Sequence, residues 1–208
     1  MRTIPAALAL VSLLLLSGSS PGPSQEKLAE ALRQRLSLGS TPVGHCRYAT
    51  PRPSRSATGW ERCESRLGYF SRYFLRSGAE HGVDPWLLAA MAIRESGLSP
   101  WAIGGLGEGG IMQLHPSSRA SHGIRFVHDP RYRRWCRARP GNCQADVVDA
   151  GARHLRAWLD RCGSQESALG GYNSGSCTGG RRYIRRVLVE RSRLLELAGD
   201  VATPVGSS

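Results

Sequence analysis

Glu95 lies on the apolar stripe of a predicted helix, so its carboxylate should point inward or into a cleft. Asp84-Pro85 is a typical helix start, and the apolar run that follows ends near Gly97. Leu88, Met91 and Glu95 are three or four residues apart, so they share one stripe of this helix. Burial and the negative end of the helix dipole both disfavour the charged carboxylate, so we predict a raised pKa. Such a group can act as a general acid, although a structural glutamate bonded to a backbone amide or an arginine has the same pattern.

A glycine-dense loop follows this helix, at residues 104–110, and leads into residues 111–116. Glycine lets the backbone approach a ligand closely. Gln113 can donate and accept hydrogen bonds, which suits an acetamido or hydroxyl group of a sugar, and Met112 offers an adaptable apolar floor. Neither glycine pattern typical of phosphate-binding loops is present, so we set nucleotide binding aside.

Three blocks in order resemble the signature of soluble lytic transglycosylases. They are Glu95-Ser96-Gly97, then Gly110-Ile111-Met112-Gln113, which begins 15 residues after Glu95, and then the block 168–175 with Tyr172-Asn173. Residues 150–155 and 183–187 are similar to two further segments of that family. The resemblance extends over about residues 82–195.

The resemblance implies an all-α, lysozyme-like fold whose groove binds peptidoglycan glycan strands. The implied reaction cleaves the MurNAc–GlcNAc β-1,4 bond without water and leaves a 1,6-anhydro-MurNAc end. Glu95 matches the single catalytic carboxyl, which protonates the leaving oxygen and then takes the proton of the attacking C6 hydroxyl. The N-acetyl group of the substrate is the expected helper. The family uses neither a cofactor nor a metal, so we expect none here.

The same resemblance assigns the remaining site residues. It places Met112 and Gln113 against the sugar rings and Tyr172 near the catalytic acid. Asn173 contacts the sugar or fixes its loop, and Tyr183 lines the same cleft. Packing or loop-fixing roles stay open for Met112, Asn173 and Tyr183. Ser96 either forms a hydrogen bond beside the glutamate or helps to end the helix.

Two other functions remain as alternatives. A goose-type lysozyme has similar blocks but uses aspartates to position water; here His115 occupies one such place, and Glu108 lies too close to the Ile-Met-Gln block to match the other. A noncatalytic cationic wall-binding or nucleic-acid-binding protein would use the net charge of +12 and the arginine-rich runs 131–139 and 181–186. Because we expect export, we expect no nucleic-acid partner.

Length and composition fit one domain with extensions, in a chain of 208 residues. Residues 1–20 are typical of a signal peptide, with Arg2 before an apolar run and small residues at its end. We interpret residues 21–59 as a linker and N-terminal extension, 60–198 as the catalytic domain and 199–208 as a flexible tail. We expect export to the periplasm or the medium, with no membrane-spanning segment after signal removal, and a monomer.

Six cysteines follow the signal segment, and an even count in an exported chain favours disulfide bridges. The simplest connectivity joins neighbours: Cys46 to Cys63, Cys136 to Cys143 and Cys162 to Cys177. The sequence contains no C-x-x-C pair, so we do not expect a structural zinc site. A metal site made by the histidines at 115, 122 and 128 is the open alternative to our expectation of no metal.

Overall fold

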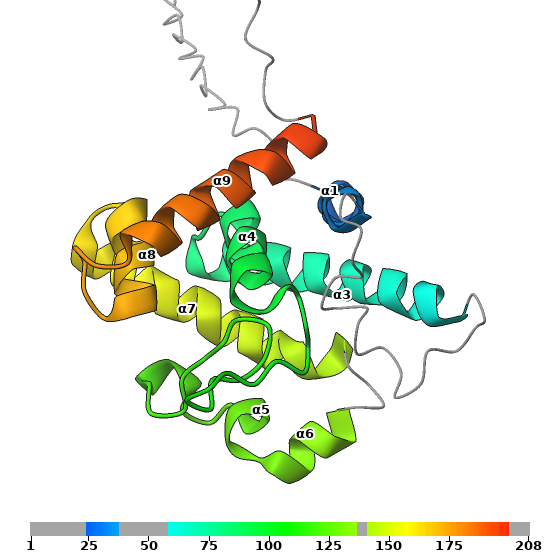
Figure 1. Cartoon of the computed structure of the whole chain (residues 1–208), viewed down its shortest axis with the longest axis horizontal. Helices are drawn as coiled ribbons and strands as arrows, with labels where there is room; N and C mark the ends of the chain where they lie inside the picture. Colours follow the sequence, from blue (N-terminus) through cyan, green and yellow to red (C-terminus); the bar gives the residue numbers. More distant parts are fainter. Residues whose placement is uncertain (1–23, 38–57, 137–140, 200–208) are drawn as a thin grey trace, which may run out of the picture.

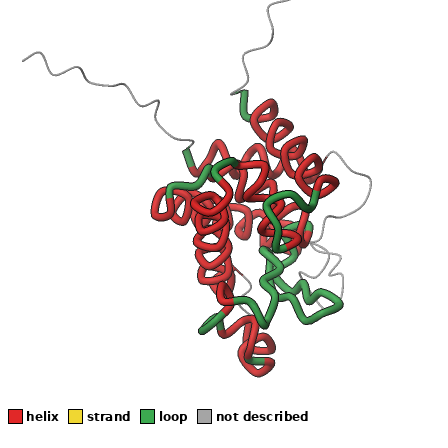
Figure 2. The backbone as a smooth tube through the Cα atoms, turned by 90° about the vertical axis from the view of Figure 1, so that its left-hand side faces the viewer, coloured by secondary structure: helices red, strands yellow, loops and turns green. Residues whose placement is uncertain are grey.

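The structure, a computed structural model, describes residues 24–37, 58–136 and 141–199. Within these ranges the chain is helical and has isolated β-bridges but no strand (Figures 1 and 2). The helices are α1 (Gln25–Ser37), α3 (Thr58–His81), α4 (Pro85–Ser96), α5 (Arg125–His128), α6 (Pro130–Cys136), α7 (Ala145–Cys162), α8 (Gln165–Ser174) and α9 (Arg181–Leu197), with 3-10 turns η1 (Arg119–Ser121) and η2 (Gly141–Gln144). The predicted all-α class is confirmed.

Helix α4 is the centre of the arrangement, in contact with α3 and α9 (Figure 1). Its residues 86–93 are all buried, as expected for a helix that is apolar around its whole circumference. Asp84 begins the helix by accepting a hydrogen bond from the Trp86 amide at 2.9 Å, and its carboxylate also pairs with Arg191 of α9. Gly97 ends the helix in the left-handed conformation, with φ 61°. These local signals place Glu95 in the last turn.

Helix α1 completes the core on the side of α3 and α9. Leu28, Leu32 and Leu36 are buried in the same apolar cluster as α4. The carboxylate of Glu190, on α9, is buried and accepts hydrogen bonds from the guanidinium of Arg35, on α1. Part of the segment that we interpreted as a linker and N-terminal extension is therefore a helix that belongs to the packed core.

Two of the three expected disulfides are present. Cys136 is bonded to Cys143, and Cys162 at the end of α7 is bonded to Cys177 in the loop after α8. The Cys46–Cys63 pairing lies outside the described side chains, as do the signal peptide and the residues after 199. The second bridge fixes the end of α8 to α7, and α8 carries the Tyr172-Asn173 pair.

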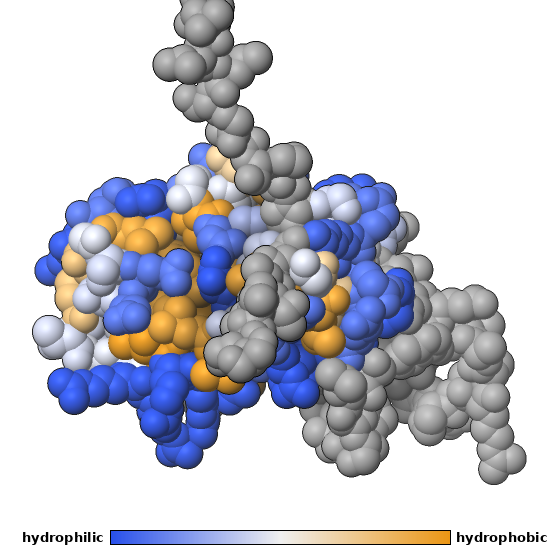
Figure 3. Space-filling view, turned by 90° about the horizontal axis from the view of Figure 1, so that it is seen from above, coloured by the Kyte–Doolittle hydropathy of each residue, from blue (hydrophilic) through white to orange (hydrophobic). Residues whose placement is uncertain are grey.

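The outer face of α9 borders solvent. Seen from this side, the molecule shows apolar surface flanked by hydrophilic side chains (Figure 3), and Val189 of α9 is exposed. In the part of the chain that the structure describes, no helix combines the length and apolar character that crossing a bilayer requires.

Candidate active site

A groove of about 430 Å³ opens beside the last turn of α4. Its walls come from α4, the loop 104–118, α7 and α8, and they bring together residues that are far apart in the sequence. The lining residues are Glu95, Gly104, Gly105, Leu106, Glu108, Gln113, Leu114, His115, Ser118, His154, Tyr172 and Asn173. Four of the seven predicted site residues, Glu95, Gln113, Tyr172 and Asn173, therefore share one groove.

Glu95 has the electrostatic character expected of a general acid. The pKa of its carboxyl is raised from 4.5 to about 7: burial is the largest cause, the Tyr183 hydroxyl opposes the rise, and the negative charge of Glu108 adds a smaller increase. Within the described residues Glu95 has no arginine partner and no hydrogen bond from a backbone amide, so neither structural role expected of such a glutamate is found. A carboxyl with this pKa exchanges its proton readily near neutral pH.

Two tyrosines surround this carboxyl from α8 and α9. The Tyr172 hydroxyl donates a hydrogen bond to the Met112 carbonyl oxygen at 2.9 Å. The Tyr183 hydroxyl is buried, is not part of the groove wall, and forms no hydrogen bond of standard geometry with the described residues, but it is close enough to Glu95 to lower the pKa of that carboxyl. Burial and the charge of Glu95 raise the pKa of both phenols well above the usual range, so both stay protonated. Tyr183 can thus donate to Glu95 whenever that carboxyl ionises.

Gln113 presents its carbonyl oxygen to the groove. Its amide nitrogen donates to the carbonyl oxygens of Gly110 at 2.9 Å and Ala102 at 3.2 Å. The side-chain oxygen accepts no hydrogen bond from the described residues and lies near Gly104 on the groove wall. Its backbone has φ 45°, a left-handed conformation that costs free energy for a residue with a side chain and that is often found at functional sites.

The Met112 side chain does not lie where it could contact a sugar in the groove. Its side chain is fully buried and lies against Gly151 of α7, close to where a Cβ at Gly151 would stand. Only the backbone carbonyl of Met112 takes part in the site, as the acceptor for Tyr172. The side chain therefore acts as part of the core beneath the loop, which corrects its interpretation as a floor for the sugar.

Ser96 also acts through the loop and not on the groove wall. Its hydroxyl lies within hydrogen-bonding distance of the carbonyl oxygens of Ala92 at 3.1 Å and Ile111 at 3.0 Å. The second of these contacts ties the end of α4 to the loop that carries Gln113. Ser96 is therefore a positioning residue.

Gln144 holds the same loop from the N-cap position of α7. Its buried side chain accepts from the Ile111 amide at 2.9 Å and donates to the Pro100 carbonyl at 3.1 Å. Gly110 is required beside it, because φ is 75° there and a Cβ would stand 2.8 Å from the Gln144 side-chain oxygen. Gln144 was not among the predicted site residues, since a lone glutamine beside a cysteine carries no sequence signal for this role.

His154 and Glu108 complete the groove wall, and neither was among the predicted site residues. The His154 ring centre is 5.1 Å from that of Tyr172, and its Nε2 accepts from the Trp158 indole at 3.3 Å. Burial lowers the pKa of His154, which favours the neutral ring. The Glu108 carboxylate accepts from the Leu106 amide at 3.0 Å and supplies a second acidic group.

Metal-ligating side chains converge elsewhere. Among the described residues, Glu80, His81 and Asp149 bring their ligand atoms within 4.8 Å of one another, away from the groove, and His81 pairs with Asp149 at 2.8 Å. The three histidines at 115, 122 and 128 form no such cluster in that part of the chain.

Comparison with known proteins decides the family. The model described as the transglycosylase SLT domain matches residues 72–186, more than half of the chain. The chain belongs to this family. The matched residues include Glu95, Gln113, Tyr172 and Tyr183. The fold of the SLT domain is lysozyme-like.

One curated relative of this SLT-domain chain is a protein named "Transglycosylase" from Enterobacteria phage PRD1. The two sequences are 29% identical over 133 residues, which is 62% of this chain and 45% of the phage protein. The chain thus spans less than half the length of that relative. No solved structure matches the chain significantly.

Replacing Glu108 in this SLT domain by glutamine should lower the pKa of Glu95. The substitution removes a negative charge that disfavours ionisation, but burial is the larger cause, so the pKa should stay well above 4.5. A carbon-13 NMR titration of the Glu95 carboxyl measures this change. Glu166→Gln, at an exposed position on α8, removes an equal charge and should leave the Glu95 pKa unchanged. Equal titration in Glu108→Gln and the wild type would contradict the prediction.

Proposed function

We propose that this protein is an exported peptidoglycan lytic transglycosylase, which cleaves the MurNAc–GlcNAc β-1,4 bond and leaves 1,6-anhydro-MurNAc ends. One observation carries the proposal: a carboxyl with a pKa of about 7 lies in a groove of an SLT domain, beside protonated phenols and an amide oxygen. The phage relative's name is consistent with it. Disulfides support export, since they persist in oxidising compartments.

The chemistry needs one group that gives and then takes a proton. Protonated Glu95 donates its proton to the glycosidic oxygen as the bond to C1 breaks, assisted by the N-acetyl group of the substrate. The resulting carboxylate then accepts the proton of the C6 hydroxyl, whose oxygen attacks C1 to close the anhydro ring. Tyr183 can donate to the carboxylate between these steps, and the second step restores the protonated form.

The groove supplies sugar contacts in this proposal. The Gln113 oxygen is free to accept from an acetamido N–H, and the exposed Asn173 side chain belongs to the part of the groove wall that α8 forms. Tyr172 is fixed by its hydrogen bond to Met112 and holds the groove floor near the carboxyl. The net charge of +12 favours encounter with an anionic wall.

Mass analysis of the fragments released from purified sacculi tests the proposal. A lytic transglycosylase gives anhydro ends, which are lighter by one water than the reducing ends made by a hydrolase. Anhydro products that are absent with Glu95→Gln are the expected result. Reducing ends would replace the proposal with a hydrolytic lysozyme, and wall binding without released fragments would replace it with a noncatalytic binding protein.

A further inference from the structure

Four arginines gather where α4 and α9 pack together, and we call them the arginine patch. Arg94 lies in the last turn of α4, next to Glu95, and Arg182, Arg185 and Arg186 lie in the first two turns of α9. All four side chains are exposed. The spacing of three and four residues places the α9 members on neighbouring positions of one face.

The charge of the patch is uncompensated by the described residues. Other arginines of the fold, such as Arg35, Arg156 and Arg191, pair with carboxylates. The four patch arginines form no such pair in the described ranges, and three of them lower the pKa of the fourth, Arg186, by repulsion. A cluster of this kind repels itself and attracts an anion, because a bound anion relieves the repulsion.

The patch borders the catalytic carboxyl. Helices α4 and α9 pack on each other, and Tyr183, which acts on Glu95, stands between Arg182 and Arg185 in the sequence of α9. The charge of Arg94 also acts on Tyr183. The inward side of α9 thus contributes Tyr183 to the site, while the arginines beside Tyr183 in the sequence place their positive charges at the surface.

We propose that the arginine patch binds the carboxylates of stem peptides on the glycan strand held in the groove. This inference rests on the proposed function. A strand in the groove carries a peptide on its MurNAc units, so the tether presents carboxylates near the rim at high effective concentration. The planar guanidinium fits a carboxylate with two parallel hydrogen bonds. A free anionic polymer has no such tether to this groove, which favours the peptide.

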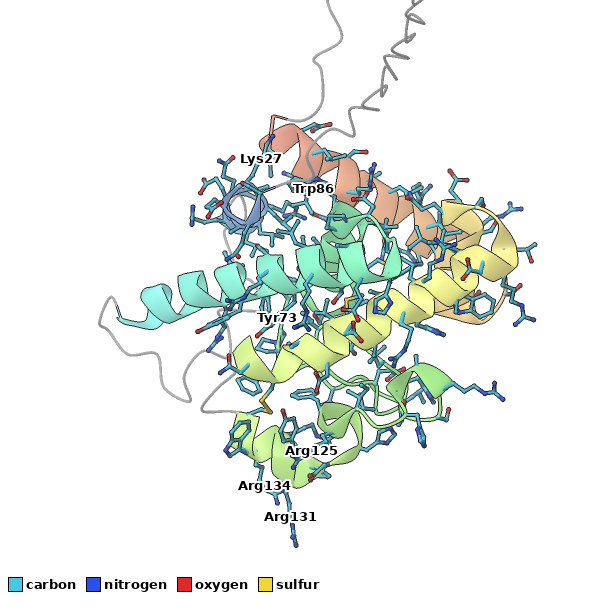
Figure 4. All side chains as sticks on the ribbon, turned by 180° about the vertical axis from the view of Figure 1, so that it is seen from behind. Lys27, Tyr73, Trp86, Arg125, Arg131 and Arg134 are labelled. Carbon is cyan, nitrogen blue, oxygen red and sulfur yellow. A yellow bond between two sulfur atoms is a disulfide. The ribbon has the colours of Figure 1, made fainter. Side chains whose placement is uncertain are left out.

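The double variant Arg182→Gln/Arg186→Gln tests the patch on two substrates: glycan strands that carry peptides, and strands stripped of peptides by an amidase. Loss of two exposed charge contacts should raise KM for peptide-bearing strands about five- to tenfold, with kcat unchanged. KM for stripped strands should stay at the wild-type value. The matched control is Arg131→Gln/Arg134→Gln, an equal charge change on α6, at the end of the molecule opposite α9 (Figures 1 and 4).

Two results would overturn the patch. One is an unchanged KM for peptide-bearing strands, and the other is an equal rise for stripped strands or in the α6 control, which would indicate general charge attraction. Equilibrium binding of the two strand types in a Glu95→Gln background repeats the comparison without turnover. Failure of the wild type to release anhydro products would overturn the proposed function alone. In the binding assay, the double variant could still prefer peptide-bearing strands, and that result would overturn the role proposed for the arginine patch.

Discussion

Glu95→Gln is expected to abolish glycan cleavage while strand binding persists. An amide can neither donate the first proton nor accept the second, so both steps lose their proton carrier. Acid-base catalysis by one group contributes about 10² to 10⁴ in rate, and in the proposed mechanism one group serves twice, so we expect turnover to fall about a thousandfold or more. Release of anhydro fragments measures turnover, and sedimentation with sacculi measures binding.

Glu196→Gln is the matched control for this change. Glu196 is exposed near the end of α9 and outside the groove, so the same substitution there should leave turnover unchanged. Activity retained by Glu95→Gln would remove the carboxyl from the mechanism. Loss of wall binding together with activity would point instead to damage of the groove.

The same variant should change the pH dependence of stability. The Glu95 pKa is raised from 4.5 to about 7 in the folded protein, so folding favours the protonated form. The resulting stability is present below the unfolded pKa and is lost as pH rises through about 7. The amide does not ionise, so near pH 8 the variant should exceed the wild type by about 3 kcal/mol in the free energy of unfolding, with little difference near pH 4. Urea unfolding at both pH values measures this.

Sequence patterns predicted the features that local chemistry determines. Asp84 and Gly97 mark the ends of α4 through capping interactions that involve their neighbours along the chain. The position of Glu95 in the last turn follows from those ends, and so does its burial. The Cys162–Cys177 bridge could also be predicted from the sequence, because no other cysteine lies between its two cysteines along the chain.

Features that depend on the path of a loop could not be predicted from the sequence in the same way. Gln113 adopts φ 45°, and this turn sends its side chain to the groove while Met112 enters the core. Nothing in the residue types indicates which of the two neighbours faces the ligand. Gln144 and His154 reach the site from the start and the middle of α7 through tertiary packing, which no periodicity in their own segment indicates.

Gly171→Ala is expected to destabilise the fold strongly. Two glycines, Gly170 and Gly171, precede Tyr172 in the sequence, and the structure supplies the reason for the second. The Trp158 ring of α7 packs so closely on α8 that a Cβ at Gly171 would stand 2.2 Å from a ring carbon. Overpacking of this kind costs about 1–3 kcal/mol or more, and urea unfolding measures it. Turnover should fall as well, because Tyr172 is the next residue.

Two further variants separate this clash from a general effect of replacing glycine in a helix. Gly68 lies in α3, where the nearest atom is 4.0 Å from the place that a Cβ would take, so Gly68→Ala should stabilise the fold by about 0.5–1 kcal/mol. Adding Trp158→Leu to Gly171→Ala removes the ring that the new methyl group meets. The double variant should therefore be more stable than the sum of the two single changes implies. Strict additivity would show that another contact sets the spacing of α7 and α8, and with it the place of Tyr172 beside Glu95.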